Sequence, residues 1–114
     1  MPRKDEREPF YRVDVAEAKE MLNGGGDQVS VIDVREPHEY QADHIPSATL
    51  IPVNSVFARR EELPKEGKLL FVCAVGQRSA LAAEMAAAAG IPADRLYNLD
   101  GGTEAWRKAG EPVE

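Results

Sequence analysis

Apolar residues along this chain gather in short runs, separated by segments in which they recur at helical spacing. Residues 29–34 and 68–72 are nearly continuous apolar runs with little polar alternation. Such runs are typical of parallel strands that are covered on both faces. Shorter segments of the same character predict three more strands, at residues 11–13, 48–51 and 95–99.

Helices are predicted between these strands. Asp14, followed three residues later by Glu17, forms a capping box that opens a helix. We expect this helix to end in residues 23–26, because successive glycines are costly in a helix. Residues 79–89 are rich in alanine, the best helix former, and predict a second helix. Shorter helical segments are predicted at residues 37–41, at residues 103–108 and from Asn54 or Ser55 through Arg60.

The order of these elements predicts the fold class. Strands that alternate with helices are typical of α/β proteins, in which helices cover both faces of a parallel sheet. The 114 residues have the usual length of one domain. We expect the densely charged residues 1–9 to form a flexible N-terminal arm and residues 10–114 to form a single domain. Ligand sites in such folds lie beyond the carboxyl ends of the strands.

Charge and composition narrow the function classes. The 14 basic and 20 acidic residues give a net charge of −6, so the chain lacks the basic surface expected for binding nucleic acid. No apolar run approaches the roughly 20 residues that span a bilayer. Residues 1–10 contain no apolar segment of the kind found in secretory signals. We therefore expect a cytoplasmic protein that does not bind membranes.

Cys73 is the only cysteine, so an intramolecular disulfide and a cysteine-rich metal site are both excluded. Neither His38 nor His44 has further ligands at a suitable spacing, and we expect no metal and no cofactor. A single cysteine is either a small buried residue or a reactive group. The sequence around Cys73 distinguishes between these two roles.

The segment that follows residues 68–72 favours a reactive Cys73. It forms a short loop that leads through Gly76 to Arg78 and Ser79, where the predicted helix begins. The free amides and the dipole at a helix N-terminus favour a thiolate over a thiol, and Arg78 adds a fixed positive charge. Gly76 permits a backbone turn that a side chain would block. Several amides of so short a loop can converge on one sulfur or oxyanion.

Four blocks of sequence extend this picture to nearly the whole chain, from about residue 10 to residue 112. They are residues 31–36 (VIDVRE) with 38–40 (HEY), residues 43–48 (DHIPSA), residues 73–79 (CAVGQRS), and residues 99–102 (LDGG) with Ala105 and Trp106. In order and spacing they are similar to the patterns D-V-R-E-x-x-E-[FY], G-H-I-x-G-A, C-x-x-G-x-R-S and L-x-G-G-x-x-A-W. These patterns mark the single-domain rhodaneses, a family of sulfurtransferases.

The resemblance implies a rhodanese-like three-layer fold with a five-stranded parallel sheet between helices. It also implies a reaction in two steps, in which the Cys73 thiolate takes a sulfane sulfur from a small donor such as thiosulfate and holds it as a persulfide. A thiophilic acceptor, such as cyanide, a thiol or a protein, then removes this sulfur. The amides of the loop would bind the transferred sulfur. The residues expected to bind substrate in this way are Ala74, Val75, Gly76, Gln77, Arg78 and Ser79.

Some features depart from the family pattern or admit two interpretations. Asp43 and Ser47 stand where glycines are usual, and either replacement could change a local turn. Arg78 is the only basic residue of the loop, so a protein with a net charge of −6 is expected to attract the thiosulfate dianion weakly. Arg35 is a candidate for binding substrate. A structural network of hydrogen bonds and ion pairs, formed by Asp33 and Arg35 with Glu36 or Glu39, is favoured, because charges at strand ends are usually paired.

Two other functions remain open at this point. Phosphatases and arsenate reductases of similar fold also place a cysteine and an arginine in such a loop. Related phosphatases have one residue more than the four that separate Cys73 from Arg78 here, and a shorter loop narrows the ring of amides. Some rhodanese-like domains are non-catalytic binding modules, usually after loss of the cysteine, whereas Cys73 is present in this chain. The sequence does not predict an oligomeric state.

Overall fold

The computed structural model describes residues 1–24 and 28–114. Their strands form one parallel sheet, in which the order β1-β5-β4-β2-β3 places the strand before Cys73 at the centre. All five predicted strands are therefore confirmed, with boundaries that shift by two residues or fewer. The strands are β1 (Tyr11–Val13), β2 (Val29–Asp33), β3 (Thr49–Leu50), β4 (Lys68–Val72) and β5 (Leu96–Leu99).

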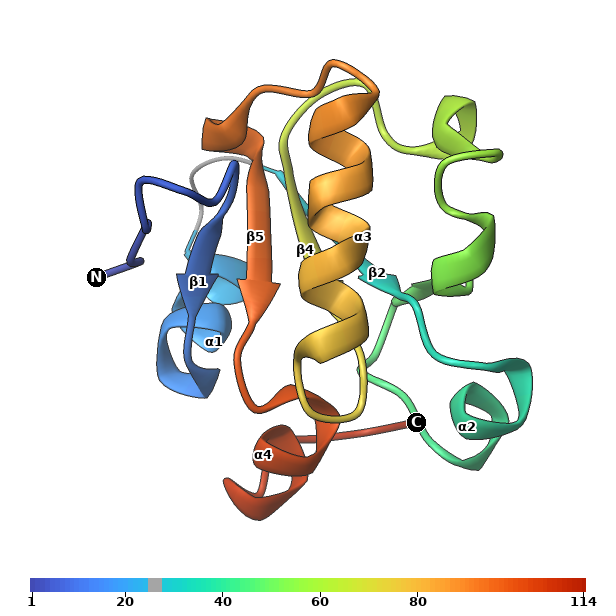
Figure 1. Cartoon of the computed structure of the whole chain (residues 1–114). Coiled ribbons are helices and arrows are strands. Elements are labelled where there is room, and N and C mark those ends of the chain that lie inside the picture. Colours follow the sequence, from blue (N-terminus) through green and yellow to red (C-terminus); the bar gives the residue numbers. More distant parts are fainter. Residues whose placement is uncertain (25–27) are drawn as a thin grey trace.

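Within the described residues, four α-helices and three short 3₁₀ helices lie between these strands or, for the last α-helix, after them (Figure 1). The predicted capping box is present, because the Asp14 carboxylate accepts from the Glu17 amide and the Glu17 carboxylate accepts from the Asp14 amide. The helices are α1 (Val15–Asn23), α2 (Pro37–Ala42), α3 (Gln77–Ala88) and α4 (Gly102–Lys108). The 3₁₀ helices are η1 (Val53–Ser55), η2 (Arg60–Glu62) and η3 (Ala93–Arg95).

The sheet has a buried core on each face, which gives the molecule three layers. Leu69 and Phe71 of β4 pack into one core, whereas Leu70 and Val72, which alternate with them, pack into the other with Trp106 of α4. In Figure 1, α3 lies in front of β4 and β5, and α1 lies behind β1. The small side chains that α3 contributes to the first core are Ala82, Ala83 and Ala86.

Two of the predicted helices differ from the structure. The prediction of a single helix from Asn54 or Ser55 through Arg60 is wrong. Two 3₁₀ helices, η1 and η2, take its place, and η1 begins directly after Pro52. The helix expected to begin at Ser79 begins at Gln77, because Gly76 takes the left-handed conformation that turns the chain into the helix. Of the residues expected to end the first helix, Gly25 and Gly26 lie outside the described residues.

The N-terminal segment lies along the edge of the sheet. The backbone of Arg3 exchanges two hydrogen bonds with that of Arg12 in β1, and the Arg3 side chain donates to the Glu17 carboxylate. Flexibility of residues 1–9 stays a prediction. In the part of the chain that the structure describes, the helices are too short or too polar to cross a membrane.

The carboxyl ends of the strands gather the segments that carry the chemistry. In Figure 1 the arrowheads of β1 and β5 point toward the end of the sheet where α2, α4 and the turn from β4 into α3 lie. Cys73 follows β4 directly, and Asp100 and Gly101 follow β5 directly. The parallel sheet therefore brings residues that are far apart in sequence to one edge.

Candidate active site

The Cys73 side chain lies in a ring of hydrogen-bond donors at the N-terminus of α3. Its residue is only 1% exposed, and its sulfur accepts hydrogen bonds from the amides of Gly76 at 3.1 Å and Ser79 at 3.3 Å. The Ser79 hydroxyl lies 3.4 Å from the same sulfur. Convergent amides at the start of a twelve-residue helix suit an anion, as the sequence predicts.

These contacts act against burial in setting the ionisation of Cys73. Burial by itself raises the pKa of the thiol, because a thiolate loses its hydration. The hydrogen bond with the Ser79 hydroxyl and those from the amides of Ser79, Gly76 and Val75 favour the thiolate and together outweigh burial. The pKa of Cys73 therefore lies below its ordinary value, as a nucleophilic cysteine requires.

Two glycines let the backbone close around the sulfur. Gly76 has a φ of +101°, a conformation that L side chains rarely adopt. Gly102 has a φ of +60°, and a Cβ there would stand 2.3 Å from the carbonyl oxygen of Cys73. The amides of Thr103 and Glu104 donate to the carbonyls of Cys73 and Ala74, at 2.9 and 3.1 Å. The first turn of α4 thus supports the loop from behind, and the Gly101–Gly102 pair serves a turn.

A buried amide connects Ser79 to β5, and sequence reasoning missed it. Asn98 is fully buried, and its Oδ1 accepts a hydrogen bond from the Ser79 hydroxyl at 2.5 Å. Its Nδ2 donates to the carbonyl of Gly76 at 3.3 Å and to the Asp100 carboxylate at 2.9 Å. The signal in the sequence was a polar residue inside an otherwise apolar strand, where a buried side chain has to find partners.

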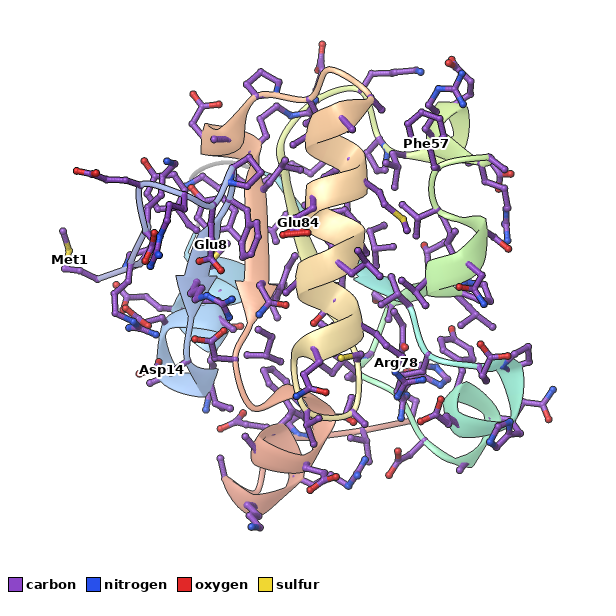
Figure 2. All side chains as sticks on the ribbon, viewed as in Figure 1. Met1, Glu8, Asp14, Phe57, Arg78 and Glu84 are labelled. Atoms are coloured by element: carbon purple, nitrogen blue, oxygen red, sulfur yellow. The ribbon has the colours of Figure 1, made fainter. Side chains whose placement is uncertain are left out.

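Arg78 does not carry a free positive charge. Both of its terminal nitrogens donate to the Glu39 carboxylate, at 2.7 and 3.0 Å, in a bidentate pair between α3 and α2. Figure 2 shows Arg78 at the lower end of α3, on the side of α2. This pair lowers the pKa of Glu39 to about 2, so Glu39 stays ionised near neutrality. The pair largely cancels the charge that the loop offers to an incoming anion.

Arg35 is buried in a separate ion pair. Its Nε and Nη2 donate to the Asp33 carboxylate, and Nη2 also donates to the carbonyl of Asp43 at 2.6 Å. Glu36 and Glu39, the partners expected from the sequence, are wrong as its hydrogen-bond partners. Asp33, the other member of the expected network, binds Arg35 instead because it lies two residues earlier at the same strand end. A role for Arg35 in binding substrate stays a prediction, and its donors here are directed to the protein.

The remaining residues of the loop form its outer surface. Val75 is 50% exposed and Gln77 is exposed, whereas Ala74 is half-buried. A pocket of about 350 Å³ borders this surface. Its lining consists of residues from the loop, from the first turns of α3, from β1 and from the turn after β5: Val75, Gly76, Gln77, Ala80, Arg12, Asp100 and Gly101.

The two departures from the family pattern have different structural effects. Ser47 has a φ of +70° and lies at the third position of a turn that the Ala48 amide closes onto the carbonyl of Ile45. Pro46 precedes it, as in a type II turn, where glycine is preferred at the third position. Asp43 has a φ of −168°, an extended conformation open to any residue, and its carboxylate accepts from Arg107. Ser47 is therefore strained, and Asp43 is not.

Comparison with known proteins shows the family of this chain. The family model for the Rhodanese-like domain matches residues 14–109. The chain belongs to the rhodanese family. This rhodanese is 30% identical over 105 residues to the thiosulfate sulfurtransferase GlpE of Vibrio cholerae serotype O1. The aligned region covers 92% of this chain and 95% of that protein.

Solved structures show the same fold. A rhodanese-related protein from Thermoplasma volcanium is 28% identical and superposes with a TM-score of 0.79, covering 90% of this rhodanese and 96% of that chain. A Rhodopseudomonas palustris protein of unknown function, named as a possible tyrosine phosphatase, is also 28% identical with a TM-score of 0.79. It covers 100% of this rhodanese and 99% of that chain.

Proposed function

We propose that this rhodanese is a cytoplasmic sulfurtransferase that carries a sulfane sulfur on Cys73 as a persulfide. The observation that supports this proposal most is the convergence of the amides of Gly76 and Ser79 on one buried sulfur. These donors favour the thiolate that attacks, and they are placed to stabilise the negative charge of the persulfide that forms. Membership of a sulfurtransferase family and the likeness to a thiosulfate sulfurtransferase support the same chemistry.

With thiosulfate as donor, the first step forms one bond and breaks one. The Cys73 thiolate attacks the outer sulfur, the sulfur–sulfur bond of thiosulfate breaks, and sulfite leaves with the bonding electron pair. In the second step an acceptor such as cyanide attacks the outer sulfur of the persulfide, which releases thiocyanate and restores the thiolate. Charge balances in both steps, and no oxidant or reductant is needed. A thiol or a protein thiol is the acceptor that we propose for the cell.

The charges of the site favour donors of low charge over the thiosulfate dianion. Arg78 is the one cation of the loop, and Glu39 binds it with both carboxylate oxygens. The protein as a whole carries a charge of −6, which repels a dianion further. We therefore propose a persulfide or another donor of low charge as the physiological substrate, with thiosulfate as an assay substrate.

The test measures sulfur transfer to cyanide by the wild type and by Cys73→Ser. Thiosulfate, a small persulfide and mercaptopyruvate serve as donors. We expect thiocyanate release to fall to background in the variant, because a hydroxyl at this position is not ionised near neutrality. Mass spectrometry of the wild type after exposure to a donor should show an added sulfur atom on Cys73 that a thiol removes. Absence of this adduct with all three donors would contradict the proposal.

Phosphatase activity is the second candidate, because of the likeness to the Rhodopseudomonas palustris protein. Cleavage of p-nitrophenyl phosphate by the wild type, and its loss in Cys73→Ser, would favour this candidate. We expect no such activity, because the four residues between Cys73 and Arg78 make a narrow ring of amides and Arg78 is bound to Glu39. If neither of these reactions nor the reduction of arsenate occurs, the remaining interpretation is a non-catalytic binding module.

A further inference from the structure

The side chain of Asn98 lies on the far side of Ser79 from Cys73. It is fully buried in β5 and bonds to three groups: the Ser79 hydroxyl, the carbonyl of Gly76 and the Asp100 carboxylate. Two of these three groups, the carbonyl and the carboxylate, can only accept hydrogen bonds. The amide NH₂ of Asn98 must therefore face them, because the reversed amide would set its oxygen against two other oxygens.

The fixed orientation of Asn98 dictates the direction of the next hydrogen bond. Oδ1 of Asn98 faces Ser79 and can only accept, so the Ser79 hydroxyl has to donate to it. A serine hydroxyl has one proton. While Ser79 gives this proton to Asn98, its lone pairs face the Cys73 sulfur at 3.4 Å. That arrangement suits a thiol, which donates its S–H to Ser79.

Ionisation of Cys73 changes this balance. When the thiol loses its proton to water, the sulfur becomes an acceptor and competes with Oδ1 of Asn98 for the single hydroxyl proton of Ser79. If the proton turns to the sulfur, Asn98 keeps a buried oxygen without a donor, which costs free energy. If the proton stays with Asn98, the thiolate lacks one of its donors. Either outcome makes the thiolate less favourable than Ser79 alone would.

We propose that Asn98 is a positioning residue that holds the Ser79 hydroxyl proton away from Cys73 and so limits the share of thiolate in the resting protein. The amides of Gly76 and Ser79 act in the opposite direction and are independent of that proton. The charged groups around this network are Arg78, which Glu39 binds, and Asp100, which lies behind Asn98 and pairs with Arg12 and Arg3. The proposal concerns ionisation alone, so it stands or falls separately from sulfur transfer.

The test uses alkylation of Cys73 by iodoacetamide, which reports the thiolate, as a function of pH. Asn98→Leu removes the competing oxygen at similar volume. We expect its alkylation rate on the acidic side of the profile to rise roughly fivefold over the wild type, the effect of one hydrogen bond of ordinary strength. Adding Ser79→Ala to this variant should lower the rate again, because the thiolate then loses the hydroxyl donor that Asn98→Leu released. An unchanged profile in Asn98→Leu would contradict the proposal.

A double variant separates this role from simple support of the loop. If Asn98 acts through the Ser79 proton, Asn98→Leu should have no effect in the Ser79→Ala background. If it only supports the carbonyl of Gly76, the same change should appear in both backgrounds, and the proposal is then wrong. Circular dichroism and thermal unfolding check that the variants fold, and Asn98→Ala provides a smaller replacement.

A measurement on the wild type needs no variant of Asn98. Cys73 is the only cysteine, so the protein has a single S–H stretching band in the infrared. The proposal expects this band at the lowered frequency of an S–H that donates a hydrogen bond, and expects it to return toward the free-thiol frequency in Ser79→Ala. A free-thiol band in the wild type at a pH where Cys73 is protonated would overturn the proposal.

Discussion

The side chains next to Cys73 act on its sulfur in two ways. The backbone amides of Gly76 and Ser79 donate to the sulfur and favour its negative charge, whereas Asn98 competes for the proton of the Ser79 hydroxyl beside it. Arg78, the one cation of the loop, instead forms two hydrogen bonds with Glu39, so its charge is balanced within the protein. The site therefore stabilises an anion mainly with fixed dipoles, which act over short distances and discriminate by fit more than by total charge.

Glu39→Gln should make thiosulfate a better substrate. Glutamine keeps an oxygen for the Glu36 amide, which Glu39 caps at 2.9 Å, but it leaves the charge of Arg78 unbalanced. We expect kcat/KM for thiosulfate to rise about fivefold, mainly through a lower KM, because an ion pair of this kind is worth up to about 1 kcal/mol. Transfer from an uncharged donor should stay within error of the wild type.

Glu62→Gln is the matched control for this prediction. Glu62 forms a similar two-oxygen pair with Arg59, outside the active-site loop, so its replacement removes the same charge from the protein. An equal gain in thiosulfate use by both variants would mean that net charge, and not the release of Arg78, determines the effect.

At the scale of elements, α4 is as much a part of the site as α3. The start of α3 supplies the amides that face the sulfur, and the first turn of α4 holds the carbonyls of Cys73 and Ala74 from the other side. The first turn of α4 lies so close to the carbonyl groups of Cys73 and Ala74 that only glycine fits at position 102. The loop is thus fixed between two helix N-termini.

Gly102→Ala should therefore displace the loop. Its Cβ would stand 2.3 and 2.4 Å from the carbonyl oxygens of Cys73 and Ala74, and both are backbone atoms. We expect at least a tenfold loss of sulfur transfer and slower alkylation of Cys73, since a displacement of about 1 Å costs roughly 10²-fold in a positioned site.

Gly110→Ala controls for backbone strain in this experiment. Gly110 also has a positive φ, of +77°, but an added Cβ would meet no atom within 4 Å. The Gly110→Ala variant should have a free energy of unfolding in urea that is lower by about 1–2 kcal/mol, with sulfur transfer unchanged. If Gly102→Ala behaves in the same way as Gly110→Ala, the contact with the loop has no catalytic effect.

Sequence alone predicted the parts of this molecule that depend on near neighbours. The capping box at Asp14 and Glu17, the five strands and the turn from Cys73 into α3 follow from local patterns of side chains and glycines. The hydrogen bonds of Ser79 to Asn98 and of Arg78 to Glu39 join residues 19 and 39 positions apart. Such pairs depend on which strands and helices lie side by side in the fold. A single sequence does not show that arrangement, so it does not predict the pairs.

At the scale of the whole molecule, the net charge of −6 adds a long-range effect to the local ones. A negative protein lowers the local concentration of anionic substrates, and dissolved salt screens that repulsion beyond roughly 10 Å at 0.1 M. Donors that differ only in charge should therefore respond differently to salt.

Added potassium chloride should raise kcat/KM for thiosulfate and leave an uncharged persulfide donor unaffected. We expect a gain of about two- to threefold between 10 mM and 200 mM salt, because screening removes most of the repulsion of a distant net charge. Steady-state rates with both donors in the same buffers are the measurement. A fall in the thiosulfate rate with salt would mean that an attractive local charge dominates the approach of the donor.

The pairing of β1 with β5 has a consequence for how the protein folds during its synthesis on the ribosome. In the sheet β1 pairs with β5, so that Tyr11 stands beside Tyr97. β1 is synthesised before β5, so it has to wait for that later strand before it gains its neighbour in the sheet. Asn98 and the supporting turn at Gly102 arrive in the same late stretch of chain. The nascent protein therefore emerges with Cys73 already made but without the surroundings that tune its sulfur.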